Sequence, residues 1–175
     1  GPLSVSDQRI HLPLLDEFQN AAEEFGIPKT KDFNTGDNHG CGYFQVTQKD
    51  GFRCSTSVGY LNPIKHRKNL KIITNAHVKK INFKDKTAEE VEFWEGDELK
   101  KVKANKEIIL SSGAIGSPQI LQVSGIGNPE KLKNLGIETV KDLKGVGENL
   151  HDHLMLRPIY KINGIKSLNK KINSL

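Results

Sequence analysis

The arrangement of apolar and polar positions predicts an amphipathic helix near the start of the chain. Between Pro13 and Phe25 apolar side chains recur every three or four residues, which is the spacing of one helix face. Gly26 follows at the position where a helix commonly ends. Because such a face is normally buried, we expect this helix to pack against a core and not to form a site.

Alternation with a period of two predicts strands in the middle of the chain. Two of them, over 90–95 and 99–104, are separated by Gly96-Asp97, which favours a tight hairpin turn. With a strand over 78–83 they predict a three-stranded meander. Further strands are expected at 42–47, 71–74, 137–140 and 154–162, and short helices at 55–61 and at 129–135, where Asn128 is the N-cap.

A continuous apolar run precedes a turn of small residues between 106 and 127. The run at 106–110 has no polar alternation, which is typical of a strand buried on both faces of a parallel sheet. Ser117 and Pro118 then favour the first turn of a helix. A strand, a tight turn and a helix N-terminus suit a phosphate group. The same corner also occurs where a helix only packs closely on a sheet.

Residues 113–127, with the sequence GAIGSPQILQVSGIG, resemble the second signature of the glucose–methanol–choline (GMC) family of flavin oxidoreductases. Within that family the choline dehydrogenases are the most similar type. Other segments match the family in the same order and extend the resemblance over nearly the whole chain. They are Gly1-Pro2-Leu3, Gly42-Tyr43, Asn75-Ala76-His77-Val78 and the stretch 145–154, GVGENLHDHL.

The resemblance implies a mixed α/β fold and a redox function. Residues 69–147 would be part of a Rossmann-like FAD-binding domain, with the meander as its crossover. Residues 1–68 and 148–175 would belong to the substrate domain. The implied cofactor is FAD, and the implied reaction oxidises a small primary alcohol such as choline to its aldehyde by hydride transfer to the flavin.

The resemblance also implies which residues contact FAD. Val78 would meet the adenine through its backbone, and the turn residues Ser112, Gly113 and Ala114 would contact the cofactor. Asn149 and His151 would lie near the flavin and the domain boundary.

No catalytic residue is assigned, because two family motifs have no match in this chain. These motifs are the dinucleotide fingerprint G-x-G-x-x-G and the segment that carries the catalytic histidine. We therefore expect the middle segment of a GMC oxidoreductase, which by itself binds FAD weakly or not at all.

Composition leaves other classes to be weighed. A net charge of +5 is compatible with nucleic-acid binding, but the basic clusters at 65–68 and 166–171 have no interleaved aromatic residues. His151 and His153 would lie on one side of a strand and could share a metal ion, although a third ligand is missing. The segment 151–153 also fits a hydrogen-bonded turn without chemistry. The chain as a whole also fits a non-catalytic α/β binding or scaffold module.

Compartment and assembly are further expectations. The sequence has no apolar stretch of about 20 residues and no leader-like start. Its two cysteines, Cys41 and Cys54, fit a reducing compartment, so we expect a cytoplasmic protein. An isolated strand at 106–110 would leave exposed strand edges, which favours a homo-oligomer.

Overall fold

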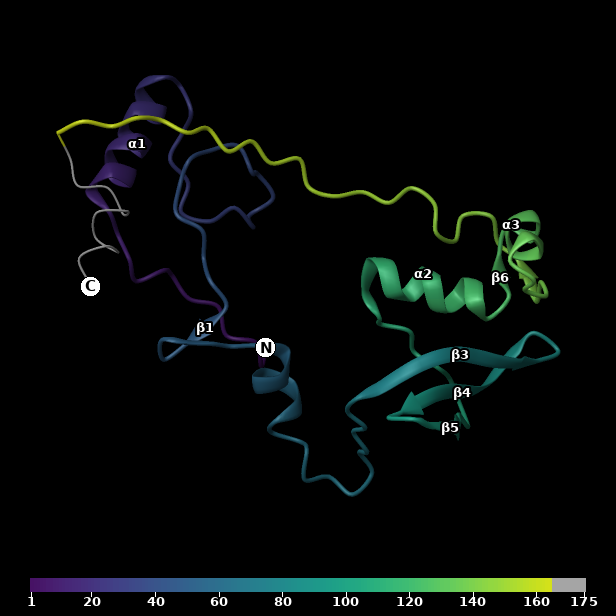
Figure 1. Cartoon of the computed structure of the whole chain (residues 1–175). Coiled ribbons are helices and arrows are strands. Elements are labelled where there is room, and N and C mark those ends of the chain that lie inside the picture. The colour runs from purple at the N-terminus through teal and green to yellow at the C-terminus, as the bar shows by residue number, and fades with distance from the viewer. Residues whose placement is uncertain (165–175) are drawn as a thin grey trace. The chain divides into compact units, whose positions relative to one another are not determined.

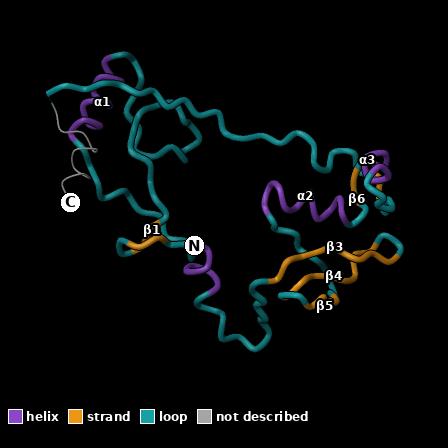
Figure 2. The backbone as a smooth tube through the Cα atoms, viewed as in Figure 1, coloured by secondary structure: helices purple, strands orange, loops and turns teal. Residues whose placement is uncertain are grey.

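The computed structural model describes residues 1–164 (Figure 1). The chain forms two compact units. One unit is residues 72–156, and the other is residues 1–71 with the described residues from 157 onward. The basic cluster at 166–171 lies outside the described residues, as does the end of the segment 148–175. The mixture of helices and strands confirms the α/β fold class (Figure 2).

An antiparallel meander is the largest regular element of the unit 72–156. It consists of β3 (Ala76–Lys84), β4 (Thr87–Glu95) and β5 (Glu98–Lys103), in that spatial order. The first turn, Asp85-Lys86, has φ angles of 48° and 73°, the left-handed pair that matches the twist of a two-residue hairpin. The second turn is Gly96-Asp97, as expected. The predicted meander is confirmed.

A β-bulge interrupts the pairing of β3 with β4. Val78 pairs with Phe93 and Lys80 with Glu92, so that Lys79 is the extra residue. A bulge of this kind redirects side chains and increases the local twist. The apolar face of the sheet is buried on both sides of the bulge, at Phe93 before it and at Ile81 after it, each 6% exposed.

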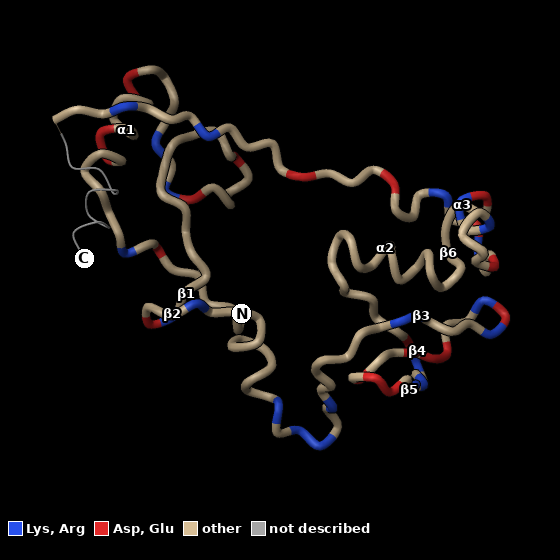
Figure 3. The backbone as a smooth tube through the Cα atoms, in the orientation of Figure 1, with Lys and Arg blue, Asp and Glu red and all other residues tan. Residues whose placement is uncertain are grey.

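Basic and acidic residues lie close together along the meander (Figure 3), and ion pairs join several of their side chains. The Nζ of Lys101 lies 3.1 Å from Glu90 Oε1, and the same oxygen accepts a hydrogen bond from Asn82 Nδ2 at 2.8 Å. The Asn82 hydrogen bond, followed by the one from Lys101, lowers the pKa of Glu90. In turn, Glu90 raises the pKa of Lys101, and Glu95 and Glu98 raise the pKa of Lys100.

Helix α2 (Gly113–Val123) begins five residues before the position expected from Ser117-Pro118. Ser112 is its N-cap and Pro118 lies inside the helix. Because a proline has no N–H, it cannot donate to the carbonyl of Ala114 one turn earlier. Pro118 is the sixth of the 11 residues of α2, so the missing hydrogen bond lies in the first half of the helix.

Two short parallel strands and a third helix complete this unit. Strand β6 (Ile126–Gly127) pairs in parallel with β7 (Lys141–Asp142), which lies just after the strand expected at 137–140. Between them, α3 (Pro129–Asn134) begins as predicted, because Asn128 Oδ1 accepts the N–H groups of Glu130 and Lys131 at 2.9 and 3.4 Å. Its Leu132 is 1% exposed.

The strand expected at 106–110 is wrong: this stretch is irregular, and Ile109 is 78% exposed. A strand needs a neighbour that accepts and donates its backbone hydrogen bonds. No described residue pairs with this stretch. Its apolar pattern is that of a buried strand, but no partner strand from the described part of the chain lies beside it.

The other unit contains few regular elements. It has α1 (Pro13–Glu24), the two-residue strands β1 (Gln48–Lys49) and β2 (Phe52–Arg53), and the π-helix η1 (Ser57–Leu61), which confirms the expected helical turn at 55–61. The strands expected at 42–47, 71–74 and 154–162 do not form. Single bridges, Ser6 with Val46 and Lys29 with Cys41, replace longer ladders here.

Helix α1 forms over the predicted residues, but the expectation that it packs into a core is wrong. None of its residues is buried, and Phe18 is 58% exposed. The helix lines an apolar groove of about 660 Å³ together with residues 158–162. Irregular chain on one side of the helix leaves much of its apolar stripe exposed to solvent.

Candidate functional site

A cavity of about 440 Å³ lies between the first strand of the meander and helix α2. Its volume is within the range of about 300–1,000 Å³ typical of small-molecule sites. Of the predicted site residues, Val78 and Ser112 line it together, although 34 positions separate them in the sequence. The other lining residues are Ala76, His77, Lys79, Trp94, Gly116, Gln119, Ile120 and Val123.

The open edge of β3 supplies backbone polar groups to this cavity. In an antiparallel ladder, the N–H and C=O of one residue point together to the partner strand or together away from it. Ile81 points away from β4, because its N–H donates to the Oγ of Ser124 at 2.8 Å. Lys79 and Lys80 together oppose the single residue Glu92 and count as one position of the ladder. Val78 therefore lies two ladder positions before Ile81 and has the same orientation. The N–H and C=O of Val78 are therefore directed to the same open edge.

The meander side of the cavity also carries a lysine ammonium group in an ion pair and an aromatic ring. Lys79 Nζ lies 3.4 Å from Glu92 Oε1 and 5.8 Å from the centre of the Trp94 ring. Glu92 is only 6% exposed, so this ion pair is shielded on one side. His77 pairs with Trp94 across the ladder and lines the cavity too. Sequence reasoning missed Lys79 and Trp94, because the bulge that brings them together has no signal in the sequence.

Gly113 and Ala114 lie at the start of α2, next to Ser112. Gly113 has a φ of +81°, and a Cβ atom built there would meet nothing within 4 Å. The backbone therefore faces open space at the end of the helix where N–H groups are unpaired. Glycine at such a position allows a ligand to approach the backbone closely.

A second groove, of about 590 Å³, lies on another side of α2 and reaches the loop 145–150. Ala114 lines this groove, as do Glu148 and Leu150, the neighbours of Asn149 in the sequence. Asn149 itself adopts a φ of +55°, a left-handed conformation in which asparagine is one of the few common residues. His151 is exposed. The structure thus places Ala114 close to the loop that carries Asn149.

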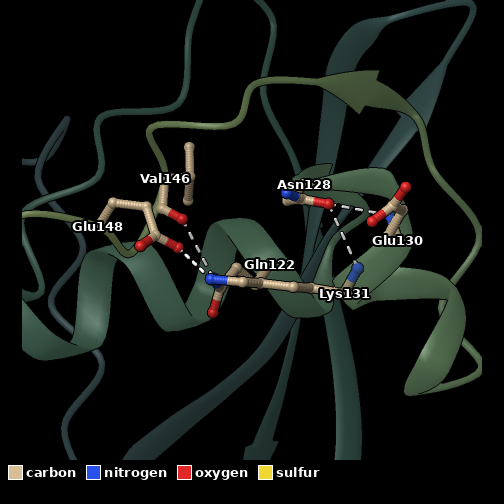
Figure 4. Close-up of polar contacts among 6 residues, drawn as sticks. All are labelled: Gln122, Asn128, Glu130, Lys131, Val146 and Glu148. Atoms are coloured by element: carbon tan, nitrogen blue, oxygen red, sulfur yellow. Dashed lines mark hydrogen bonds and ion pairs between the residues drawn. The ribbon is translucent and has the colours of Figure 1, made fainter.

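Two side chains attach this loop to the helices (Figure 4). Gln122 Nε2 on α2 donates to the carbonyl oxygen of Val146 at 3.2 Å. Lys131 on α3 forms an ion pair with Glu148. Gly147, with a φ of +79°, lies so close to Gln122 that a Cβ atom there would be 2.5 Å from Nε2. Sequence reasoning did not single out Gln122 or Lys131, because their partners are distant in the sequence.

Another cluster of titratable groups lies in the unit that contains α1. The hydroxyl of Tyr43 donates to Asp16 Oδ1 at 2.7 Å, and the Tyr43 ring contacts His11 edge to face with ring centres 4.7 Å apart. Desolvation and then the hydrogen bond to Asp16 raise the pKa of Tyr43. Over residues 1–164 no group of three or more His, Cys, Asp or Glu is placed to hold a metal ion.

Comparisons with known proteins give one consistent result. A family model described as GMC oxidoreductase matches residues 1–155. The oxygen-dependent choline dehydrogenase of Photobacterium profundum is 41% identical over 98% of this chain. The mitochondrial choline dehydrogenase of Homo sapiens is 40% identical over 97% of it. The chain spans 30% of the length of each of these relatives.

Solved structures show the same relationship. An FAD-dependent oxidoreductase from Chaetomium thermophilum has a TM-score of 0.82 and 34% identity, covering 87% of this chain and 27% of its own. Pyridoxine 4-oxidase from Mesorbium loti has a TM-score of 0.75 and 28% identity, covering 81% of this chain and 28% of its own. No helix of the described residues is long and apolar enough to cross a membrane.

Proposed function

The chain belongs to the GMC oxidoreductase family, and we propose that it is the middle segment of an FAD-dependent alcohol dehydrogenase. The proposed substrate is a primary alcohol of the choline type, since relatives of about 40% identity are named choline dehydrogenases. Bound FAD supplies the hydride acceptor with which such an alcohol is oxidised to its aldehyde. The proposal concerns the complete oxidoreductase, because this chain covers 30% of those relatives.

One observation carries the proposal: Val78 lines the cavity that Ser112 also lines, and the ladder register directs its N–H and C=O away from β4. A residue on an open strand edge offers one N–H donor and one C=O acceptor side by side. The Watson–Crick edge of adenine offers the complementary pair, N1 as acceptor and the N6 amino group as donor. Val78 is thus suited to bind the adenine of FAD without any side-chain contact.

The turn before α2 and the loop 145–150 would hold the rest of the cofactor. Gly113 leaves open space in front of the helix N-terminus, whose N–H groups suit an anionic group. Ala114 lines the groove that reaches the neighbours of Asn149. In this arrangement Ser112, Gly113 and Ala114 follow the cofactor between its two ends. Asn149 and His151 belong to the flavin end of the proposed site.

The roles proposed for this chain are binding and orientation. We assign no catalytic residue to it. Residues 69–147 would contribute to the FAD-binding domain, and residues 1–68 and 148–175 to the substrate domain. The general base for the alcohol, and the groups that pass electrons on from the reduced flavin, would come from outside the residues described.

The test removes the N–H of Val78 from the complete oxidoreductase. Val78→Pro deletes this donor, and on an open strand edge proline interrupts no ladder hydrogen bond. We expect Val78→Pro to lose most of its FAD on gel filtration, whereas Val78→Ala, which keeps the N–H, retains it. The measurement is the ratio of flavin to protein absorbance. Wild-type flavin content in Val78→Pro would contradict the proposed adenine contact.

A second measurement concerns the 175-residue chain alone. We expect a desalting column to separate added FAD from the chain, so that the flavin absorbance bands near about 370 and 450 nm are found with the free flavin and not with the protein. Trp94 is the one tryptophan of the chain and lines the cavity, so its fluorescence also reports weak binding. Stoichiometric FAD on the purified chain would show that this segment is sufficient by itself.

Partners, assembly and compartment are part of the proposal. We propose that the protein has no nucleic-acid partner, because several meander lysines are already paired with glutamates. We propose a homo-oligomer through an exposed strand edge, for which β5 at the outer side of the meander is the available edge, and light scattering of the purified protein tests it. We also propose a cytoplasmic location for this protein. Two mammalian relatives are mitochondrial by name, so cell fractionation provides the test.

A further inference from the structure

We propose that Ser124 is a positioning residue that sets the width of the cavity between β3 and α2. It would thereby determine how tightly the adenine half of the cofactor binds. This inference rests on the proposed function, because it assigns the adenine to the open edge of β3. Ser124 follows the last residue of α2 and is 7% exposed.

The hydroxyl of Ser124 connects the helix to the strand. It donates to the carbonyl oxygen of Ile120 at 2.5 Å and accepts the N–H of Ile81 at 2.8 Å. Both hydrogen-bonding functions of the hydroxyl are therefore used between main-chain groups. A buried N–H that loses its acceptor is costly, so the strand has a strong preference for this helix position.

Two of the outward-facing backbone positions on this strand edge are relevant here. Ser124 occupies the one at Ile81, and the other, at Val78, faces the cavity. The bulge at Lys79 lies between them. One position is thus used by the protein itself to hold α2, and the neighbouring one is left for a ligand.

The face of α2 that lines the cavity is attached at its C-terminal end by Ser124. Gly116, Gln119, Ile120 and Val123 line the cavity and follow the spacing of one helix face. From Gly116 to Ser124 the helix extends about 12 Å, at about 1.5 Å per residue. Because Ser124 lies at one end of this length, a small rotation about it moves the opposite end toward or away from Val78.

The experiment measures the two halves of the cofactor separately. The complete oxidoreductase is freed of FAD and titrated calorimetrically with ADP for the adenine end and with FMN for the flavin end. We expect Ser124→Ala to weaken ADP binding about tenfold and to leave FMN binding within about twofold of wild type. Ser124→Thr keeps the hydroxyl and should bind ADP within about threefold of wild type.

A matched control separates positioning from a general loss of stability. Phe93→Leu reduces packing in the same meander, but Phe93 does not line the cavity. It should lower the melting temperature and leave both dissociation constants unchanged. If Ser124→Ala does not fold, Ser124→Cys replaces it, with a weaker acceptor of similar size and an expected loss of about threefold for ADP.

Each result supports or overturns a distinct statement. Wild-type ADP affinity in Ser124→Ala, or an equal loss for FMN and ADP, overturns the positioning role and leaves the proposed function in place. An equal loss in Ser124→Thr and Ser124→Ala also overturns it, because the hydroxyl would then not matter. A wild-type protein that binds no ADP overturns the proposed adenine site and this inference together.

Discussion

The two units of this chain differ strongly in internal order. In residues 72–156, three strands are joined by two-residue turns, and the apolar side chains of Ile81, Phe93 and Leu132 are buried. In residues 1–71, strands are two residues long, and Phe25 and Phe52 are at least 80% exposed. Both units contain a hairpin with a two-residue turn, but the hairpin of β1 and β2 ends after two residues per strand, whereas the meander strands are six to nine residues long.

The difference teaches that apolar residues order a chain only where backbone partners lie close by. In the meander each strand finds its neighbour after two residues, so the loop-closure cost is small. The apolar stripe of α1 has no such neighbour, since its surroundings are irregular. The proposed site belongs entirely to the ordered unit, in which fixed distances between β3 and α2 are available.

The largest predicted contrast compares two phenylalanines. Phe93→Ala removes a side chain that is 6% exposed, and Phe25→Ala one that is 85% exposed. We expect the first to reduce the free energy of unfolding by about 3–5 kcal/mol and the second by less than about 0.5 kcal/mol. Urea unfolding followed by far-ultraviolet circular dichroism measures both. Equal losses would mean that Phe25 is buried in solution.

A smaller contrast compares two glycines with left-handed φ angles, Gly125 at +89° and Gly26 at +96°. Alanine at either position costs about 1–2 kcal/mol of backbone strain. At Gly125 an added Cβ would also lie 2.5 Å from the carbonyl oxygen of Glu138, whereas at Gly26 nothing lies within 4 Å. We therefore expect Gly125→Ala to lose about 2 kcal/mol more.

Hydrogen exchange locates the effect of the glycine substitutions. The amides of Val140 and Lys141 donate to the carbonyl of Gly125 at 2.8 and 3.2 Å. They should exchange faster in Gly125→Ala and at the wild-type rate in Gly26→Ala. Unchanged exchange in Gly125→Ala would indicate that β6 and β7 adjust around the new side chain.

The same principle explains how far the sequence predicts this fold. The meander and α3 follow from local signals, namely alternation, two-residue turns and the Asn128 cap, and all were predicted. The stretch 106–110 has the composition of a buried strand but no described partner, so its prediction was wrong. Strand formation there depends on chain that lies far away in the sequence or in space, which no local pattern reports.

The residues of the candidate site also fall into those that the sequence predicts and those that it does not. The resemblance pointed to Val78 and Ser112, and the structure brings them to one cavity, whereas their contacts with FAD stay a prediction. Ser124, Lys79 and Trp94 were missed because their arrangement depends on a one-residue bulge. A slip of one residue reverses the faces of a strand, so the alternation pattern alone assigns this edge wrongly.

The smallest predicted effect is the acid dependence of the ordered unit. Hydrogen bonds from Asn82 and Lys101 hold the pKa of Glu90 below its ordinary value of 4.5. A carboxyl with a lowered folded-state pKa stabilises the fold above its unfolded pKa, and this contribution is lost as the pH falls through the folded pKa. The free energy of unfolding should therefore decrease on acidification below about pH 4.5.

Glu90→Gln tests this acid dependence because it removes the titrating group and keeps the side-chain shape. Its unfolding free energy should fall less steeply below pH 4.5 than that of the wild type, in urea titrations followed by Trp94 fluorescence. Asn82→Ala removes the largest cause of the lowered pKa and should give an intermediate slope. Since Trp94 lies in the unit 72–156, a wild-type slope in Glu90→Gln would assign the acid sensitivity to other carboxylates of that unit.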